Sequence, residues 1–180
     1  GYEYSRTHNP TRGALEKSFA SIENGHYGLA FGSGLAAIDA VIKLLEPGDE
    51  VISTNDLYGG TYRLFTKIFE KFQIKFHFTG MQDIQQIENC ISPKTKLIWV
   101  ETPTNPMLNI IDIKAVSALA IKYSVLLAVD NTFATPVIQK PISLGIDIVI
   151  HSATKYFGGH SDISAGAVAS SQKVIDSLWD

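Results

Sequence analysis

The sequence has little that would support a disulfide framework, a thiolate metal site or a membrane span. Cys90 is the only cysteine among 180 residues, so it can form neither an internal disulfide nor a cage of cysteine ligands. No apolar run approaches the roughly 18 residues that a membrane-spanning helix needs. Fifteen basic and eighteen acidic residues give a net charge of −3, which lacks the positive excess typical of proteins that bind nucleic acid or an anionic membrane.

The composition is that of a globular protein that can bury a core. Apolar residues make up 45% of the chain and charged residues 18%. A length of 180 residues corresponds to one domain of ordinary size. The chain begins with Gly rather than Met, so we expect it to be a piece of a longer protein. No signal-like segment opens it, and we expect a cytoplasmic location.

Short apolar segments alternate with amphipathic stretches along the chain. The apolar segments predict strands at residues 27–31, 50–54, 74–78, 96–101, 125–130 and 147–152. Apolar residues at helical spacing predict helices at the segments that begin at 10, run from 34 to 45, cross 64–72 and lie near 82–91 and 112–123. This alternation, without a repeat or a linker, predicts one α/β domain. Its mostly parallel sheet is covered by helices on both faces, as a three-layer sandwich.

Small and polar residues directly follow the predicted strands. In open α/β sheets, ligands bind in the crevice outside the carboxyl ends of the strands. The sequence therefore predicts an active site built from these strand exits. They are Gly32–Gly34, Asn55–Tyr58, Glu101–Asn105, Asp130–Thr132 and Ser152–Lys155.

The first strand exit combines two glycines with the start of a helix. Small residues let the backbone approach an anion, and a helix N-terminus presents free N–H groups, so a phosphate site is one interpretation. The segment Gly32–Ala37 also satisfies the dinucleotide pattern G-x-G-x-x-A, with Asp56 about twenty residues further on. A tight turn that only packs the helix onto the sheet explains the same letters equally well.

Asp130 ends one apolar strand and Lys155 follows another, and these two side chains carry the charged groups of interest. A desolvated carboxylate such as Asp130 needs a cation or a strong donor, the alternative being a solvated cap at the strand end. The Lys155 amine directly after a buried strand favours covalent chemistry with an aldehyde. The alternative is that the Lys155 side chain only reaches solvent. Pyridoxal phosphate (PLP) unites these features, because it needs a lysine, a carboxylate for its ring nitrogen and an anion cradle.

Other residues at the strand exits fit the same cofactor, although each also fits a local turn or cap. Tyr58 offers an aromatic ring for the face of the cofactor. Asn105 offers a donor for the 3′-oxygen, and the hydroxyls of Ser152 and Thr154 offer donors for the phosphate.

Five motifs, in order along the whole chain, resemble those of the Cys/Met-metabolism PLP enzyme family. They are Tyr4–Pro10 (YSRTHNP), Leu57–Thr61 (LYGGT), Glu101–Pro106 (ETPTNP), Asp130–Thr132 (DNT) and Ser152–Tyr156 (SATKY). The resemblance implies the large domain of a fold type I PLP-dependent transferase, similar to aspartate aminotransferase. It also implies that residues 1–180 are an incomplete large domain, without the N-terminal arm and the C-terminal small domain.

The resemblance assigns three residues to catalysis. Lys155 is similar to the lysine that binds the cofactor aldehyde and moves the Cα proton. Asp130 is similar to the carboxylate that keeps the ring nitrogen protonated. Tyr58 is similar to the tyrosine that stacks on the ring and acts as an acid or base at the γ-leaving group.

The same resemblance assigns the cofactor phosphate to two sets of residues. Within the chain it implies the backbone N–H groups of Gly34 and Leu35 and the hydroxyls of Ser152 and Thr154. From a neighbouring subunit it implies Tyr4 and Arg6, which would reach the phosphate of the partner's cofactor. A homo-oligomer, a dimer usually paired into a tetramer, follows from that arrangement.

Within the family the sequence favours γ-elimination or γ-replacement on a sulfur amino acid, as in cystathionine γ-lyase and γ-synthase. Methionine γ-lyases generally carry a cysteine two residues after the stacking tyrosine, where this chain has Gly60. Cystathionine γ-lyase and γ-synthase activities stay open, with methionine γ-lyase, O-acetylhomoserine sulfhydrylase and cystathionine β-lyase as the alternatives within the family.

Three alternatives lie outside this interpretation. A nicotinamide-dependent dehydrogenase would use Gly32–Ala37 but leaves Lys155 and Asp130 without roles. A non-catalytic assembly module would keep only oligomer contacts. A metal site at His151, His160 and Asp162 is disfavoured, because a loop hydrogen-bond network explains these residues better, and we expect no metal.

Overall fold

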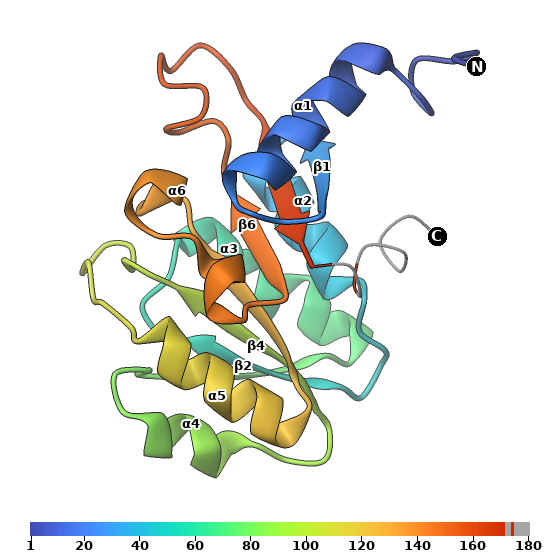
Figure 1. Ribbon diagram of the computed structural model, residues 1–180. Coiled ribbons are helices and arrows are strands. Elements are labelled where there is room, and N and C mark those ends of the chain that lie inside the picture. The colour runs from blue at the N-terminus through green and yellow to red at the C-terminus, as the bar shows by residue number, and fades with distance from the viewer. Residues whose placement is uncertain (172–173, 175–180) are drawn as a thin grey trace.

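A seven-stranded sheet with helices on both faces forms the body of the chain in the computed structural model, which describes residues 1–171 and 174 (Figure 1). Its strands are β1 (Tyr27–Phe31), β2 (Glu50–Thr54), β3 (Lys75–Thr79), β4 (Thr95–Glu101), β5 (Leu126–Asp130), β6 (Ile148–His151) and β7 (Gly166–Ser170). Its helices are α1 (Pro10–Ile22), α2 (Gly34–Ile42), α3 (Gly59–Lys67), α4 (Ile84–Cys90), α5 (Ile113–Tyr123) and α6 (Thr135–Ile138), with 3-10 helices η1 (Phe69–Phe72) and η2 (Pro141–Leu144). Within the described residues, none of these helices has the length and apolar character needed to cross a bilayer.

The sheet is mostly parallel, as predicted. Its strand order is β1-β7-β6-β5-β4-β2-β3, and every pair from β6 to β3 is parallel. Only β7 runs against its two neighbours, β1 and β6. The pairing of β4 with β5 ends with Glu101 opposite Asp130, so these strands finish level at one edge of the sheet.

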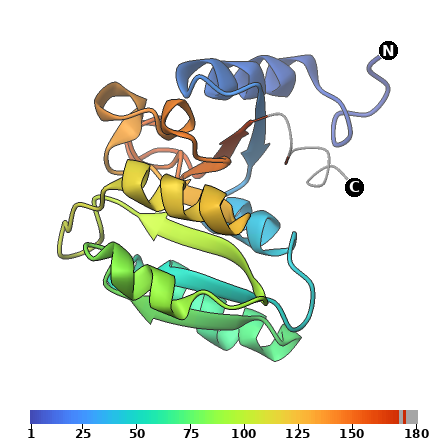
Figure 2. The same cartoon turned by 60° about the horizontal axis from the view of Figure 1, so that its bottom comes forward.

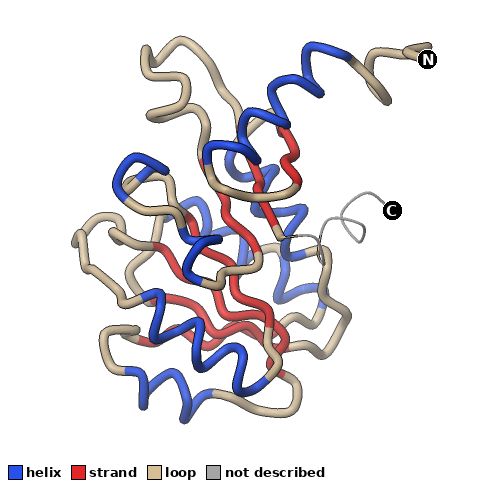
Figure 3. The backbone as a smooth tube through the Cα atoms, in the orientation of Figure 1, coloured by secondary structure: helices blue, strands red, loops and turns tan. Residues whose placement is uncertain are grey.

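Alternate residues of the central strands pack against the two helical layers. On β4, Leu97 and Trp99 belong to the core cluster that includes α2 and α3, whereas Ile98 and Val100 belong to the cluster that includes α4 and α5. Figure 2 shows α4 and α5 together on one face of the sheet, and Figure 3 shows the strands between the helices. Because both faces are covered, the strands are apolar almost throughout, and the predicted three-layer sandwich is confirmed.

The structure differs from the sequence predictions at three elements. The helix predicted across 64–72 breaks at Ile68 into α3 and η1, although Phe65 and Phe69 are both buried as their spacing predicted. The second helix ends at Ile42 rather than at residue 45. Strand β7 was not predicted, because its sequence GAVAS consists mainly of small residues with weak strand preference.

Candidate active site

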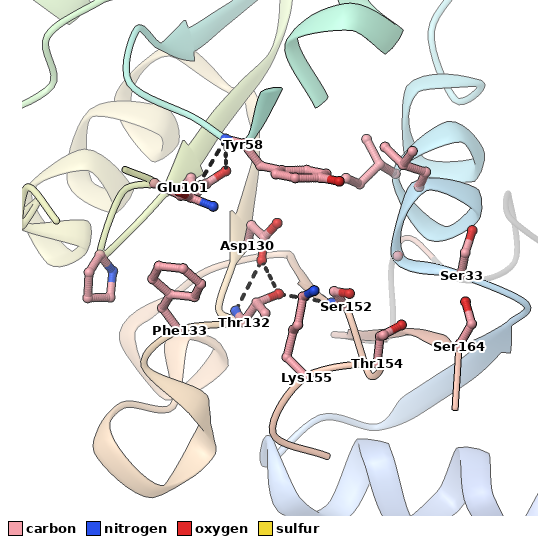
Figure 4. A pocket seen from close by; sticks show the side chains of 15 residues that line it. Ser33, Tyr58, Glu101, Asp130, Thr132, Phe133, Ser152, Thr154, Lys155 and Ser164 are labelled. Atoms are coloured by element: carbon pink, nitrogen blue, oxygen red, sulfur yellow. Dashed lines mark hydrogen bonds between the residues drawn. The ribbon is translucent and has the colours of Figure 1, made fainter. Parts of the chain in front are cut away.

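A pocket of about 420 Å³ lies where β4, β5 and β6 end, beside the start of α2 (Figure 4). This is the edge of the sheet that the strand exits predicted. Eight of the predicted site residues line it together: Gly34, Leu35, Tyr58, Asn105, Asp130, Ser152, Thr154 and Lys155.

One wall of the pocket joins the start of α2 to the segment after β6. Ser33 is the N-cap of α2, and its hydroxyl accepts a hydrogen bond from the Ala36 N–H at 3.1 Å. Gly34 allows the helix to approach Ser152, because a Cβ at position 34 would lie 2.9 Å from the Ser152 Cβ. Ser164 lines the same wall. Hydroxyls grouped around a helix N-terminus suit an anion such as a phosphate.

Lys155 stands in the turn that follows β6. Its side chain points into the pocket, toward Asp130 and Thr132 (Figure 4). The neighbouring Thr154 hydroxyl donates to the Ala165 carbonyl and accepts from the Ala165 N–H, both at 3.1 Å. Thr154 therefore also holds the segment that carries the lysine.

Asp130, the last residue of β5, is a buried carboxyl on the pocket wall. The N–H and hydroxyl of Thr132 donate to its Oδ1 at 3.0 and 2.5 Å, and the Ser152 N–H donates to the Thr132 hydroxyl at 2.9 Å. Burial raises the pKa of Asp130, while the Thr132 hydrogen bonds and the nearby His151 act in the opposite direction. The two Thr132 donors therefore stabilise the ionised form of Asp130 against the effect of its burial.

Glu101, at the end of β4, is an ionisable pocket residue to which the sequence assigned no role. It is 6% exposed, and the Tyr58 N–H donates to its two carboxyl oxygens at 3.0 and 3.2 Å. Burial and the charge of Asp130 raise the pKa of Glu101 to about 8, against the effect of the Tyr58 and Asn105 N–H groups. The sequence shows that Glu101 ends an apolar strand, but only the pairing of β4 with β5 places it beside Asp130.

Tyr58 is half exposed and lines the pocket from the turn before α3. Its ring lies against Gly60, since a Cβ at position 60 would be 2.3 Å from the Tyr58 Cε1. Because Gly60 has no side chain, the Tyr58 ring can occupy this position.

Asn105 reaches the pocket on a loop that Asp56 holds. The Asp56 Oδ2 accepts hydrogen bonds from the Met107 N–H at 3.1 Å, from the Asn109 side-chain amide at 3.2 Å and from the Thr104 hydroxyl. Asp56, the acid that a dinucleotide site would use for a ribose, is thus engaged in shaping this loop.

Tyr4 and Arg6 do not line the pocket. Both are exposed in the segment before α1, where the Arg6 guanidinium lies 5.1 Å from the centre of the Tyr4 ring. Figure 1 shows this segment at the periphery of the chain. Their contact with a neighbouring subunit's cofactor stays a prediction.

A buried polar cluster joins the end of α1 to the residues beside Asp130. Glu23 is 1% exposed, and its Oε1 accepts from the His151 Nε2 at 2.5 Å and from the Asn131 side-chain amide at 2.9 Å. Its Oε2 has no hydrogen-bond partner among the described residues. The described residues contain no group of three ligating side chains placed for a metal ion.

The residues of the pocket fit PLP. They provide a primary amine, a buried carboxyl with hydrogen-bond donors, an aromatic ring and a helix N-terminus that Gly34 opens to a close approach. These are the groups that the aldehyde, the ring nitrogen, the ring face and the phosphate of PLP need.

The chain is similar in sequence and in structure to known PLP-dependent enzymes. The family described as Cys/Met metabolism PLP-dependent enzyme matches residues 1–178. The chain is 52% identical over 175 residues to cystathionine gamma-lyase of Bacillus subtilis and 48% identical over 177 residues to cystathionine gamma-synthase of Mycobacterium tuberculosis. These matches cover 97% and 98% of the chain but 46% of each relative, so the chain spans about half the length of the curated relatives it matches. The crystal structure of cystathionine gamma-lyase from Lactobacillus plantarum complexed with L-serine has a TM-score of 0.97 at 47% identity, over 99% of this chain and 47% of that one.

Proposed function

The chain belongs to the Cys/Met metabolism PLP-dependent enzymes, and on this premise we propose that it forms the cofactor site of an enzyme that performs γ-elimination or γ-replacement on a sulfur amino acid. The observation that carries the proposal is the convergence of Lys155, Asp130 and Tyr58 on one pocket. A small amino acid is the class of substrate that fits the family.

Each of the three residues has a separate task in this proposal. When bound, PLP supplies an aldehyde for amino groups and a ring that withdraws electrons. The Lys155 amine would hold the cofactor through that aldehyde and, once the substrate amine has displaced it, would take the proton from the substrate Cα. Asp130 holds a proton on the ring nitrogen, which requires its carboxylate to be ionised. The Tyr58 phenol delivers a proton to the γ-leaving group.

The remaining predicted residues position the cofactor and its phosphate. The N–H groups of Gly34 and Leu35, with the hydroxyls of Ser152 and Thr154, would hold the phosphate, and Asn105 would donate to the 3′-oxygen. Tyr4 and Arg6 would complete the phosphate site of a partner subunit in a homo-oligomer, and their exposure in the single chain is compatible with that role.

Residues 1–180 would be the greater part of the large domain, in accordance with a span of 46% of the relatives' length. A cytoplasmic location stays a prediction, which cell fractionation would test.

Several activities remain as candidates. The chain has similar identities to a γ-lyase, a γ-synthase and a β-lyase, so the identities favour none of these activities. Gly60 distinguishes the chain from methionine γ-lyases, which generally have a cysteine there, and makes methionine the less suitable substrate.

Product analysis of the full-length protein tests the proposal. We expect either 2-oxobutyrate, ammonia and cysteine from cystathionine by γ-elimination, or cystathionine from an O-acylhomoserine and cysteine by γ-replacement, with the acyl group released as a carboxylate. Lys155→Ala should reduce either rate by at least about a thousandfold, in the range seen when a group that reacts covalently is removed. Lys114→Ala, at an exposed position of α5, is the matched control and should keep the rate. Absence of both reactions, or a Lys155→Ala variant with full activity, would contradict the proposal.

A further inference from the structure

Two carboxyl groups end neighbouring strands inside the same pocket. Glu101 and Asp130 are opposite each other at the last pair of β4 and β5. They are 6% and 8% exposed, and both line the pocket. Two negative charges on directly opposite residues of neighbouring strands repel strongly where water does not screen them. The pair therefore favours a state with a single negative charge.

The hydrogen bonds indicate which member of the pair carries that charge. Asp130 accepts from both the N–H and the hydroxyl of Thr132, and His151 lies close enough to favour its ionised form. Glu101 accepts from the Tyr58 N–H, and the Asn105 N–H adds a smaller contribution that also lowers its pKa. The hydroxyl donor at 2.5 Å and the nearby His151 favour the charge on Asp130, whereas Asp56 disfavours a charge on Glu101, so the proton belongs on Glu101.

The other groups around Glu101 do not favour a second charge. Asp56, in the loop after β2, adds further negative charge and raises the pKa of Glu101. Lys155, whose positive charge would offset this effect in an ion pair, lines the same pocket from the turn after β6. Among residues 1–171 and 174, neither Glu101 nor Asp130 lies within ion-pair distance of a lysine, an arginine or a histidine.

We propose that Glu101 is a positioning residue of this site, present as a neutral carboxylic acid. It holds the turn of Tyr58 through the Tyr58 backbone N–H, and it leaves Asp130 as the charged partner for the cofactor's ring nitrogen. The inference rests on the proposed function, since it names the residue that prepares Tyr58 and Asp130 for their tasks.

The neutral acid has a direct consequence for substitutions. Glutamine has the shape of a protonated glutamate, and its carbonyl oxygen accepts the same Tyr58 N–H. Alanine leaves that N–H without its acceptor, and such a loss is costly in a buried site. The amide should therefore restore what alanine removes, which an obligatory carboxylate would not allow.

Infrared spectroscopy of the full-length protein at pH 7 tests the protonation. A protonated carboxylic acid has a C=O stretch at a higher frequency than the bands of carboxylates and amides, and we expect this band in the wild type and its loss in Glu101→Gln. The control is Glu50→Gln, at the start of β2, because Glu50 accepts from Ser92 and His77 and its pKa is lowered. Its band pattern should match the wild type. A wild type without the band, or Glu101→Gln with it, would overturn the proposal.

Titration of the cofactor-free protein with PLP tests the positioning. We expect Glu101→Ala to weaken PLP binding about tenfold, the effect of a lost hydrogen bond to a buried N–H. Glu101→Gln should recover most of that loss, and equal weakening in both variants would overturn the proposal. Asp130→Asn separates this inference from the proposed function. If the wild type does not bind PLP, or Asp130→Asn binds equally well, the proposed function fails, whereas the infrared result still reports on Glu101.

Discussion

Replacing Glu101 with glutamine should flatten the pH dependence of the protein's stability between pH 5 and pH 8. The pKa of Glu101 rises from an ordinary value of 4.5 to about 8 in the folded chain. Between these values the folded state binds a proton that the unfolded state has released, so the free energy of unfolding falls as the pH rises. The slope is about 1.4 kcal/mol per pH unit for one proton, and the whole interval corresponds to about 5 kcal/mol at most.

Glutamine cannot ionise, so this contribution should disappear in the variant. Relative to the wild type, Glu101→Gln should gain stability from pH 5 to pH 8, by several kcal/mol at the upper end. Urea unfolding of the cofactor-free, full-length protein at pH 5, 6, 7 and 8 measures the difference between the two proteins. Glu50→Gln is the control, because Glu50 has a lowered pKa and is ionised in both states above pH 5. Parallel curves for the wild type and Glu101→Gln would refute the reasoning.

Three further substitutions test other parts of the structure. Asp130→Asn should lower turnover by at least about a hundredfold, because an amide cannot hold the ring nitrogen protonated, and steady-state kinetics measures it. Gly60→Ala should displace the Tyr58 ring, since the added Cβ would lie 2.3 Å from its Cε1, and should lower kcat about tenfold with little loss of PLP affinity. Glu23→Ala should cost about 3–5 kcal/mol in urea unfolding, because it removes the partner of the buried His151.

Each of these three substitutions has an outcome that contradicts the account. Asp130→Asn with wild-type turnover would remove the carboxylate from the reaction. Gly60→Ala with unchanged kinetics would mean that the ring position does not matter. Glu23→Ala with a loss below about 1 kcal/mol would mean that the buried pair adds no more than an exposed one.

The sheet and most of the pocket were predictable because their signals are local. Each parallel strand is a continuous apolar run, as in residues 97–100, and a strand buried on both faces needs such a run. The carboxyl ends of parallel strands meet at one edge, so residues such as Asp130 and Lys155 were predicted to meet without any knowledge of the register.

What the sequence did not predict depends on pairings between distant segments. Glu101 meets Asp130 through the register of β4 with β5, and Tyr58 is 43 residues from Glu101 in the sequence. Glu23 and His151 are 128 residues apart, so neither position alone shows that the two side chains meet. Strand β7 lacks the apolar side chains that identify the other strands, and its place is set by the strands on either side.

Identification of the residue that holds the cofactor tests the central claim most directly. The full-length protein, loaded with PLP, is reduced with borohydride, which converts the link between lysine and cofactor into a stable amine, and its peptides are mapped by mass spectrometry. The account predicts a pyridoxyl group on Lys155, and predicts its loss in Lys155→Ala but not in Lys114→Ala. A pyridoxyl group on another lysine, or none in the wild type, would contradict it.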